Sequence, residues 1–357
     1  MALFSMDEIK RRVDNFPKAE LIHLPTPLHK LENLSQTLRG PEIYMKRDDL
    51  TGLAFGGNKS RKLEFIIQDA LEKKADVILT WASIQSNWCL QTAAAAKKFD
   101  IKPILILFKS YDLPKEYDGN LLLNYILGAD IRVREAEKGK VLKMDDVQEV
   151  IEEVANEVKE WGFTPYIAPI GGSMVGGSME MPLGAISYLR AYVEILEQAK
   201  DQGFEFNAVI HPTGSGGTQA GLIVGAKALH EEGRVLGISV SDEKESFSKE
   251  VLCITHDTVE ALKLGLSIGK EDVLVFDEYT REGYGVVTKE ISEAIRLVAI
   301  EEGIFLDPVY TGKAMAAFID LIRKEYFNKE DKVIFFHTGG TPAIFPNKHY
   351  LVDFLGL

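Results

Sequence analysis

Segments rich in apolar residues alternate along the chain with longer segments whose apolar residues recur at helical spacing. A strand buried on both faces reads as a continuous apolar run, whereas an amphipathic helix has a period near 3.6 residues. Helices are therefore expected between the runs, as at 87–98, 121–127 and 144–161, and this alternation is typical of parallel sheets covered by helices. The segments predicted as strands are 42–46, 76–81, 103–108, 130–134, 166–170, 208–210, 236–240, 273–276 and 333–336.

Turn and cap signals divide this alternation. The run from Ser5 to Glu8 matches a capping box and predicts a short helix that ends near 15–17. Two glycine pairs in the segment 171–178 indicate a loop that returns the chain from one domain to another. For 357 residues about two domains are expected. We predict a larger domain from residues 1–55 and 171–357, and a smaller one from residues 56–170.

The charge limits the possible partners. A net charge of −13 argues against nucleic acid or an anionic membrane, because both are bound through clustered cations. A small molecule is the expected partner. The two cysteines, Cys89 and Cys253, lie far apart, and the seven histidines are scattered, so no metal site is predicted.

The same features favour a reducing compartment, because no disulfide framework is suggested. The first eight residues lack a basic segment followed by an apolar core, and no apolar run approaches the roughly 20 residues that span a bilayer. We expect a cytoplasmic protein.

A glycine-hinged loop delivers a lysine to the start of a helix. Gly56 and Gly57 allow tight backbone geometry, Lys59 follows, and an apolar stripe continues from Leu63. With the cationic neighbours Arg61 and Lys62 and a partly dry pocket, the ammonium form of Lys59 would be disfavoured, as a nucleophilic amine requires. The alternative is a solvated basic helix start.

Two other loops follow apolar strands and precede helices, the place where open α/β sheets bind ligands. Ser86 and Asn87 lie in the first loop, although helix capping alone would explain them. The second runs from Thr213 to Gly221, and its glycines would let backbone N–H groups converge on a phosphate. It is neither a P-loop nor a dinucleotide fingerprint.

A third stretch, Asp307 to Lys313, places Tyr310 before another helix, where its hydroxyl could reach a cleft. A buried structural tyrosine is the alternative. The last stretch, 336–342, carries Thr338 among glycines, and we interpret His337 as structural.

Together these stretches resemble the pyridoxal-phosphate enzymes of the tryptophan-synthase-β-like fold. Within them, the chain is similar to the D-cysteine desulfhydrase and 1-aminocyclopropane-1-carboxylate (ACC) deaminase family over nearly its whole length. The resemblance implies two open, twisted, mostly parallel sheets with the active site between them, and a homodimer acting on an amino acid. The motifs that carry it are Lys46-Arg47-Asp48-Asp49, Gly56 to Glu64, Gln85-Ser86-Asn87, Thr218 to Gly221 and Asp307 to Lys313.

The resemblance also implies residue roles. Lys59 would carry pyridoxal 5'-phosphate through its amine, Asn87 would bind the ring hydroxyl, and Ser86 would lie beside the substrate carboxylate and α-carbon. Gln85, Asn87 and Trp88 would contact the substrate as well, and Thr338 the cofactor. The catalytic tyrosines would be Tyr284 and Tyr310, and the phosphate would be held by Gly214, Ser215, Gly216, Gly217 and Thr218.

Two positions separate the activities of this family. ACC deaminases carry glutamate after the second tyrosine and an apolar residue at the later position, whereas this chain has Thr311 and Thr338. A hydroxyl gives a shallower electron sink than a carboxylate near the pyridine nitrogen, which favours β-elimination over ring opening. We predict a lyase that converts D-cysteine or a related amino acid to pyruvate, ammonia and sulfide.

The chain departs from the family at Trp88-Cys89-Leu90 and in a longer loop at 174–181. Both differences touch the region expected to contact the substrate side chain, so cysteate or a thioether, of either chirality, stays open. ACC deaminase and an L-cysteate sulfo-lyase are the alternative enzymes. A cofactor- or amino-acid-binding protein without turnover is the alternative outside catalysis.

Overall fold

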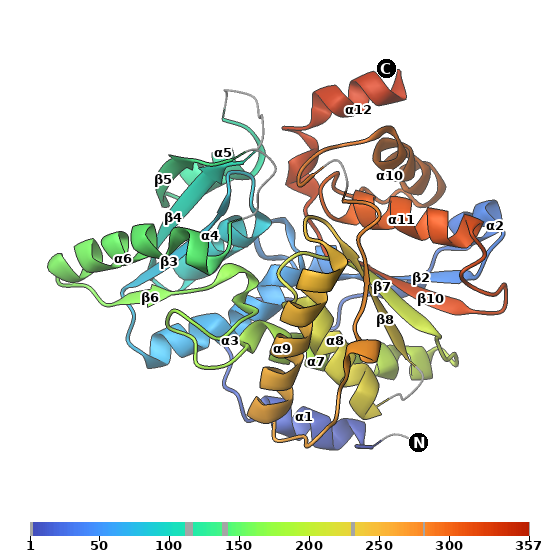
Figure 1. Ribbon diagram of the computed structural model, residues 1–357, viewed down its shortest axis with the longest axis horizontal. Helices are drawn as coiled ribbons and strands as arrows, with labels where there is room; N and C mark the ends of the chain where they lie inside the picture. The colour runs from blue at the N-terminus through green and yellow to red at the C-terminus, as the bar shows by residue number, and fades with distance from the viewer. Residues whose placement is uncertain (1–2, 111–116, 138–141, 230–232, 281–282, 357) are drawn as a thin grey trace.

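The computed structural model describes residues 3–110, 117–137, 142–229, 233–280 and 283–356, and it holds two separate sheets (Figure 1). The larger sheet has the order β1-β2-β10-β7-β8-β9 and the smaller one β5-β4-β3-β6. Every pairing is parallel except that of β1 with β2. The larger sheet comprises β1 (Leu28–Lys30), β2 (Glu42–Arg47), β7 (Ala208–Thr213), β8 (Arg234–Ser239), β9 (Leu274–Phe276) and β10 (Lys332–His337); the smaller comprises β3 (Val77–Ser83), β4 (Lys102–Lys109), β5 (Asp130–Glu135) and β6 (Pro165–Ile167).

Helices fill the intervals between the strands, as the apolar pattern predicts. Ser5 caps the first helix by accepting a hydrogen bond from the Glu8 amide at 3.1 Å, which confirms the capping signal. The helices are α1 (Met6–Asp14), α2 (Glu32–Leu38), α3 (Asn58–Glu72), α4 (Asn87–Lys98), α5 (Gly119–Ile126), α6 (Met144–Glu160), α7 (Leu183–Asp201), α8 (Gly217–Leu229), α9 (Lys244–Ala261), α10 (Lys289–Glu302), α11 (Thr311–Arg323) and α12 (Lys348–Leu355).

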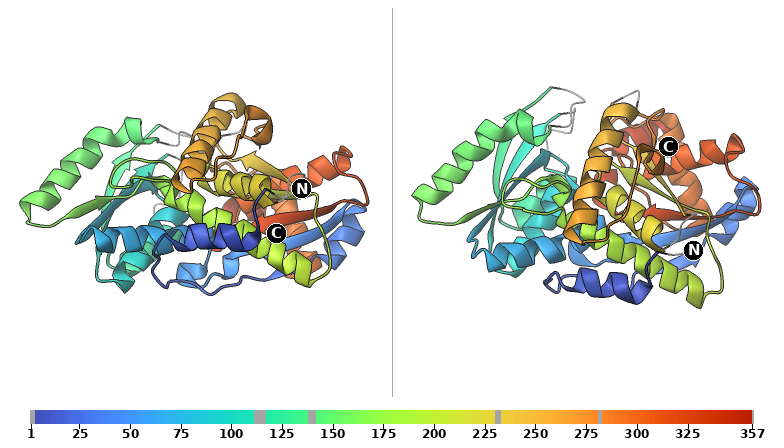
Figure 2. Two further views of the ribbon diagram at one scale, coloured as in Figure 1. Left: turned by 90° about the horizontal axis from the view of Figure 1, so that it is seen from below. Right: turned by 60° about the horizontal axis from the view of Figure 1, so that its bottom comes forward.

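The fold is the expected mixed α/β arrangement with mostly parallel sheets. All strands between residues 77 and 167 belong to the smaller sheet, and the remaining described strands belong to the larger one. The domain boundaries themselves stay a prediction. Figure 2 shows the two sheet units side by side along the long axis, with α1 on the same side as α7, against which it packs.

Helix α3 connects the two units, because it packs against α7 of the larger unit and α4 of the smaller one. Helix α7 in turn packs closely against α8 at Gly221, where an added Cβ atom would lie 2.2 Å from the Ala185 carbonyl oxygen. Only glycine permits this approach. The first turn of α3 is therefore held on a tightly packed support.

A buried ionic network fixes the start of α3 further. The Arg61 guanidinium donates to Asp48 Oδ2 at 2.7 Å and to Glu194 Oε2 at 3.0 Å. Lys46 Nζ donates to Glu194 Oε1 at 2.6 Å, and the Tyr188 hydroxyl donates to Asp48 Oδ2 at the same distance. Buried charges that are paired and hydrogen-bonded in this way tie three distant segments together.

Candidate active site

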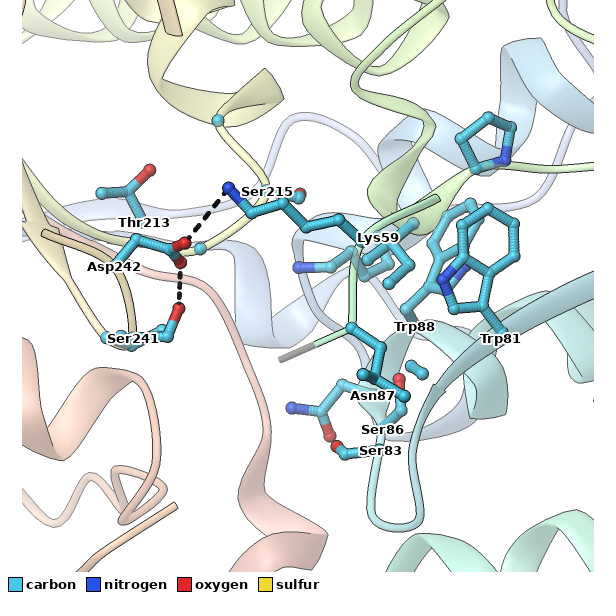
Figure 3. Close-up of a pocket in the computed structure, with 18 of the residues that line it drawn as sticks. Lys59, Trp81, Ser83, Ser86, Asn87, Trp88, Thr213, Ser215, Ser241 and Asp242 are labelled. Atoms are coloured by element: carbon cyan, nitrogen blue, oxygen red, sulfur yellow. Dashed lines mark hydrogen bonds and ion pairs between the residues drawn. The ribbon is translucent and has the colours of Figure 1, made fainter. Parts of the chain in front are cut away.

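The carboxyl ends of strands from both sheets surround one cavity of about 320 Å³. Loops that leave β3, β7, β8 and β10 contribute to its wall, as expected for a ligand site in parallel sheets. The lysine and the glycine-rich loop, which are about 155 residues apart in the sequence, thus share a cavity (Figure 3). The predicted residues that line it are Lys59, Ser86, Asn87, Trp88, Gly214, Ser215, Gly216, Thr218, Tyr284, Tyr310 and Thr338.

Lys59 is the second residue of α3, and its backbone position depends on the glycine before the helix. Gly57 has φ 136°, and an added Cβ would lie 2.6 Å from Gln91 Nε2 and 3.0 Å from the Thr338 carbonyl oxygen. The lysine amine donates to Asn58 Oδ1 at 2.8 Å and lies 5.9 Å from the centre of the Tyr310 ring. Its side chain is therefore directed into the cavity.

Burial lowers the pKa of Lys59 to about 8, against the opposing effect of the Asp307 carboxylate. The charges of Arg61 and Lys62 were expected to contribute to this shift, but neither is among its causes. The charge of Arg61 is taken up by Asp48 and Glu194. Burial, and then the charge of Lys59, lower the pKa of Lys62 well below its usual value. The shift of Lys59 thus comes from burial.

The loop between β7 and α8 has the geometry of an anion site. Gly216 has φ 76° and precedes the first turn of α8, whose amides have no partners within the helix. The Ser215 hydroxyl lies 2.9 Å from that of Ser173, and Asn58 Nδ2 donates to the Thr218 hydroxyl at 3.2 Å. Gly217 opens α8 but does not line the cavity, because Ser173 packs against it.

The loop between β3 and α4 serves both purposes that the sequence left open, helix capping and a place in a ligand site. Ser86 is the N-cap of α4 and accepts a hydrogen bond from the Cys89 amide at 3.2 Å. Asn87 Oδ1 accepts from Asn120 Nδ2 at 2.7 Å, which orients the Asn87 side chain. Both residues also line the cavity, at the N-terminus of α4, where the helix dipole favours a carboxylate.

Gln85 differs from its predicted place. Its Nε2 donates to the Asp118 carbonyl at 2.9 Å, and its Oε1 accepts from the Asn120 amide at 2.7 Å. Its side chain is not among the residues that line the cavity. The amide group of Gln85 therefore fixes the start of α5. The predicted contact of Gln85 with the substrate is corrected accordingly, because its side chain lies outside the cavity lining.

The two predicted tyrosines meet in the cavity wall. Their hydroxyl oxygens lie 2.7 Å apart, and the Tyr284 hydroxyl lies 3.3 Å from Ser83 Oγ of the smaller sheet. Burial raises the pKa of Tyr284. Lys313 holds the chain nearby by donating to the carbonyls of Val240 and Gly283. Tyr310 can thus exchange a proton with a second hydroxyl.

Thr338 and Thr311 occupy different environments. Thr338 lines the cavity, whereas the buried Thr311 hydroxyl donates to Asp307 Oδ1 at 2.7 Å. The same carboxylate accepts hydrogen bonds from the amides of Val309, Tyr310 and Thr311. Of the two hydroxyls considered in the sequence argument, that of Thr338 faces the cavity.

Other residues that line the cavity were not predicted from the sequence. Trp81 and Phe108 come from the ends of β3 and β4, and Ser241 and Asp242 follow β8. Their place at the carboxyl ends of parallel strands was a signal that could have identified them. Figure 3 shows Trp81 and Trp88 on the opposite side of Lys59 from Asp242.

These donors fit a cofactor that carries an aldehyde and a phosphate. The phosphate would meet the glycine-rich loop, the Ser215 and Thr218 hydroxyls and the first amides of α8. The Thr213 hydroxyl is buried at the cavity wall without a hydrogen-bond partner among the described residues, as expected where a polar ligand belongs. The Lys59 amine would take the aldehyde. Fold and site together define a cofactor-dependent enzyme of α/β class.

Comparison with known proteins identifies the family. The model of the pyridoxal-phosphate dependent enzymes matches residues 19–339, and the chain belongs to this family. It is 40% identical to a Pyrococcus furiosus protein named provisionally as an ACC deaminase, over 98% of this chain and 99% of that one. It is 38% identical to a D-cysteine desulfhydrase of Serratia proteamaculans, over 94% and 98%. A crystal structure of an ACC deaminase homologue is 36% identical, with a TM-score of 0.86 over 97% and 99% of the two chains.

The comparisons confirm the resemblance, the fold and the cofactor, pyridoxal phosphate. Among the described residues, no helix is both long and apolar enough to cross a membrane. Within the same residues, no group of three histidine, cysteine or acidic side chains could hold a metal ion.

Proposed function

We propose that this protein is a pyridoxal-phosphate-dependent lyase that performs β-elimination on D-cysteine or a related β-substituted amino acid. The products are pyruvate, ammonia and sulfide or another leaving group. The observation that carries the proposal is the shared cavity of Lys59, Ser86 and the tyrosine pair. The 38% identity to a D-cysteine desulfhydrase supports the choice of substrate.

Each group has a chemical part in this proposal. Ser86 and Asn87, at the N-terminus of α4, bind the substrate carboxylate. The Lys59 amine, whose pKa burial lowers to about 8, takes the α-proton as a base when it is in its neutral form. Pyridoxal phosphate supplies an electron sink for the charge left on the α-carbon. Tyr310 donates a proton to the departing sulfur, and Tyr284 restores it.

β-Elimination is preferred to ring opening because threonine occupies both positions that separate the two activities, 311 and 338. Thr338 presents a hydroxyl to the cavity, and the Thr311 position holds no carboxylate. A hydroxyl beside the pyridine nitrogen stabilises its protonated form less than a carboxylate does. That is sufficient for a good leaving group such as a thiolate. ACC deaminase is the second candidate, because a relative at 40% identity carries that name.

The test is a spectrum followed by a product assay. The holoenzyme should absorb above ~400 nm, and Lys59→Ala without added amino acid should abolish the band, because the lysine is then the amine with which the cofactor conjugates. Pyruvate and ammonia should form from D-cysteine faster than 2-oxobutyrate forms from ACC. A protein that stays colourless with added cofactor contradicts the family role of Lys59, and faster ring opening reverses the substrate ranking.

The protein is also proposed to be a cytoplasmic homodimer. Both cysteines are free, which suits a reducing compartment. The proposed dimer is supported by an exposed region formed by α5 and η5 (Thr341–Ile344), which pack against each other. This region exposes large apolar side chains. Tyr125, Ile126 and Phe345 are 44%, 71% and 59% exposed. Large apolar side chains exposed on two elements that pack together are a feature of subunit interfaces. A monomer by light scattering would contradict this part.

A further inference from the structure

One wall of the cavity is apolar, and no role in the proposed elimination uses it. Trp81, Phe108 and Ile170 line this wall from β3, β4 and η3 (Ile170–Gly172), and Met174 continues it outward with 45% of its surface exposed. Trp88 of α4 also lines the cavity, and its Nε1 donates to Thr80 Oγ1 at 2.7 Å. The indole of Trp88 is thereby fixed as part of the wall.

The outer part of the cavity is acidic. Asp145, Asp242 and Glu250 line it together with Lys143. The Lys143 amine lies 3.4 Å from Asp242 Oδ1 and also forms an ion pair with Glu250. Three carboxylates and one ammonium group thus line this part of the cavity, and the ammonium group is already paired with two of the carboxylates. Among the described lining residues, the only other lysine or arginine is Lys59.

We propose that the substrate class is a cysteine whose sulfur carries a neutral alkyl or aryl group, and that anionic side chains such as the sulfonate of cysteate are rejected. The inference rests on the proposed elimination. Each buried methylene contributes about 0.8 kcal/mol to binding an apolar group, or roughly fourfold in affinity. A sulfonate would lose hydration and meet carboxylates instead of a free cation.

The reaction is balanced without a further reactant. The Cβ–S bond breaks, its electron pair leaves with sulfur, and the sulfur takes one proton to form a thiol. The remaining three-carbon amine takes one water and releases pyruvate and ammonium. Carbon and sulfur are neither oxidised nor reduced by an outside agent.

The first experiment compares kcat/KM of the holoenzyme for S-phenylcysteine, S-methylcysteine, cysteine and cysteate, each as both enantiomers. For the enantiomer that reacts, S-phenylcysteine should exceed S-methylcysteine by about tenfold or more, because the wall buries the ring. Cysteate should fall below cysteine. Equal values, or a preference for cysteate, would overturn the inference. If none of the four amino acids gives pyruvate, the proposed elimination fails instead.

Two substitutions on exposed or partly exposed positions test the wall and the charge separately. Met174→Ser should lower the ratio of S-phenylcysteine to cysteine activity about threefold, whereas Ile300→Ser should leave it unchanged. Ile300 is 67% exposed on α10 and does not line the cavity. Glu250→Gln should raise cysteate activity relative to cysteine several-fold, and this gain should shrink at high salt. Unchanged ratios in both variants would contradict the inference.

A binding measurement gives a readout apart from turnover. 2-Amino-4-phenylbutanoate has the shape of S-phenylcysteine with carbon in place of sulfur, so it cannot eliminate a thiol. Its inhibition constant should be at least about tenfold lower than that of 2-aminobutanoate, and Met174→Ser should reduce the difference. Equal inhibition constants would show that the wall does not receive the side chain.

Discussion

The hydroxyl oxygen of Tyr284 lies 2.7 Å from that of Tyr310, although the two residues belong to separate loops. The Tyr284 hydroxyl also lies 3.3 Å from Ser83 Oγ, so the hydroxyl chain crosses from the larger to the smaller sheet unit. Proton transfer along hydroxyls needs this spacing. The pair therefore joins two hydroxyls at the cavity to a third hydroxyl on the smaller sheet unit.

We predict that Tyr310→Phe lowers kcat for β-elimination about a hundredfold, because the hydroxyl proposed to protonate the departing sulfur is lost. Tyr284→Phe should reduce kcat less, since Tyr310 keeps its own hydroxyl. Steady-state assays of pyruvate formation measure both. Equal losses with an unchanged cofactor spectrum would mean that the two hydroxyls act as one unit. No loss in Tyr310→Phe would remove this residue from catalysis.

The pKa of Lys59 predicts a pH dependence of cofactor loading. Burial lowers this pKa to about 8, so the amine is largely protonated below pH 8 and largely neutral above it. Only the neutral amine attacks an aldehyde. The rate at which the cofactor-free enzyme takes up pyridoxal phosphate should therefore rise as pH increases towards 8 and level off above it. A rate that keeps rising to pH 10 would indicate an ordinary lysine.

Alanine substitutions at two glycines with similar φ can distinguish the effect of backbone strain from an effect on phosphate binding. Gly216 and Gly203 have φ 76° and 73°, but only Gly216 belongs to the glycine-rich loop. Each alanine substitution should cost about 1–2 kcal/mol of unfolding free energy through left-handed backbone strain. Only Gly216→Ala should also weaken cofactor affinity, because Gly216 lines the cavity and Gly203 does not. Equal dissociation constants would argue against a phosphate at this loop.

The network around Arg61 predicts a large stability effect. Arg61→Met would leave the Asp48 and Glu194 carboxylates buried without the guanidinium, at a cost of about 3–5 kcal/mol. The control is Lys289→Met, which removes an exposed ion pair with Glu293 and should change stability by less than about 1 kcal/mol. Denaturant unfolding of both variants provides the comparison. Similar midpoints would show that the network is dispensable.

Regular elements could be predicted from the sequence because their signals are local. The predicted helix at 87–98 matches α4, and the apolar runs fall on strands of both sheets. β1 was missed because it has three residues and pairs antiparallel at a sheet edge. Such a short strand is defined by its partner β2, and no periodicity develops over its length.

The site was only partly predictable for a related reason. Lys59 and the glycine-rich loop carry their own local signals. By contrast, the partner of Arg61 at Glu194 is 133 residues away, and the two hydrogen bonds of Gln85 depend on the folded start of α5. Likewise, Trp81 reads as an ordinary strand residue until the cavity beside it is known. Long-range contacts decide these side-chain positions, and a local pattern does not contain them.

The ionic anchor of α3 has an evolutionary consequence. Arg61, which holds the helix in place, stands only two positions from Lys59 on the same helix. Mutations that alter Asp48 or Glu194 would therefore shift the reactive amine as well as weaken the fold. Descendants of this chain can change their substrates more freely through the apolar wall than through this network, because the network holds both the fold and the position of Lys59.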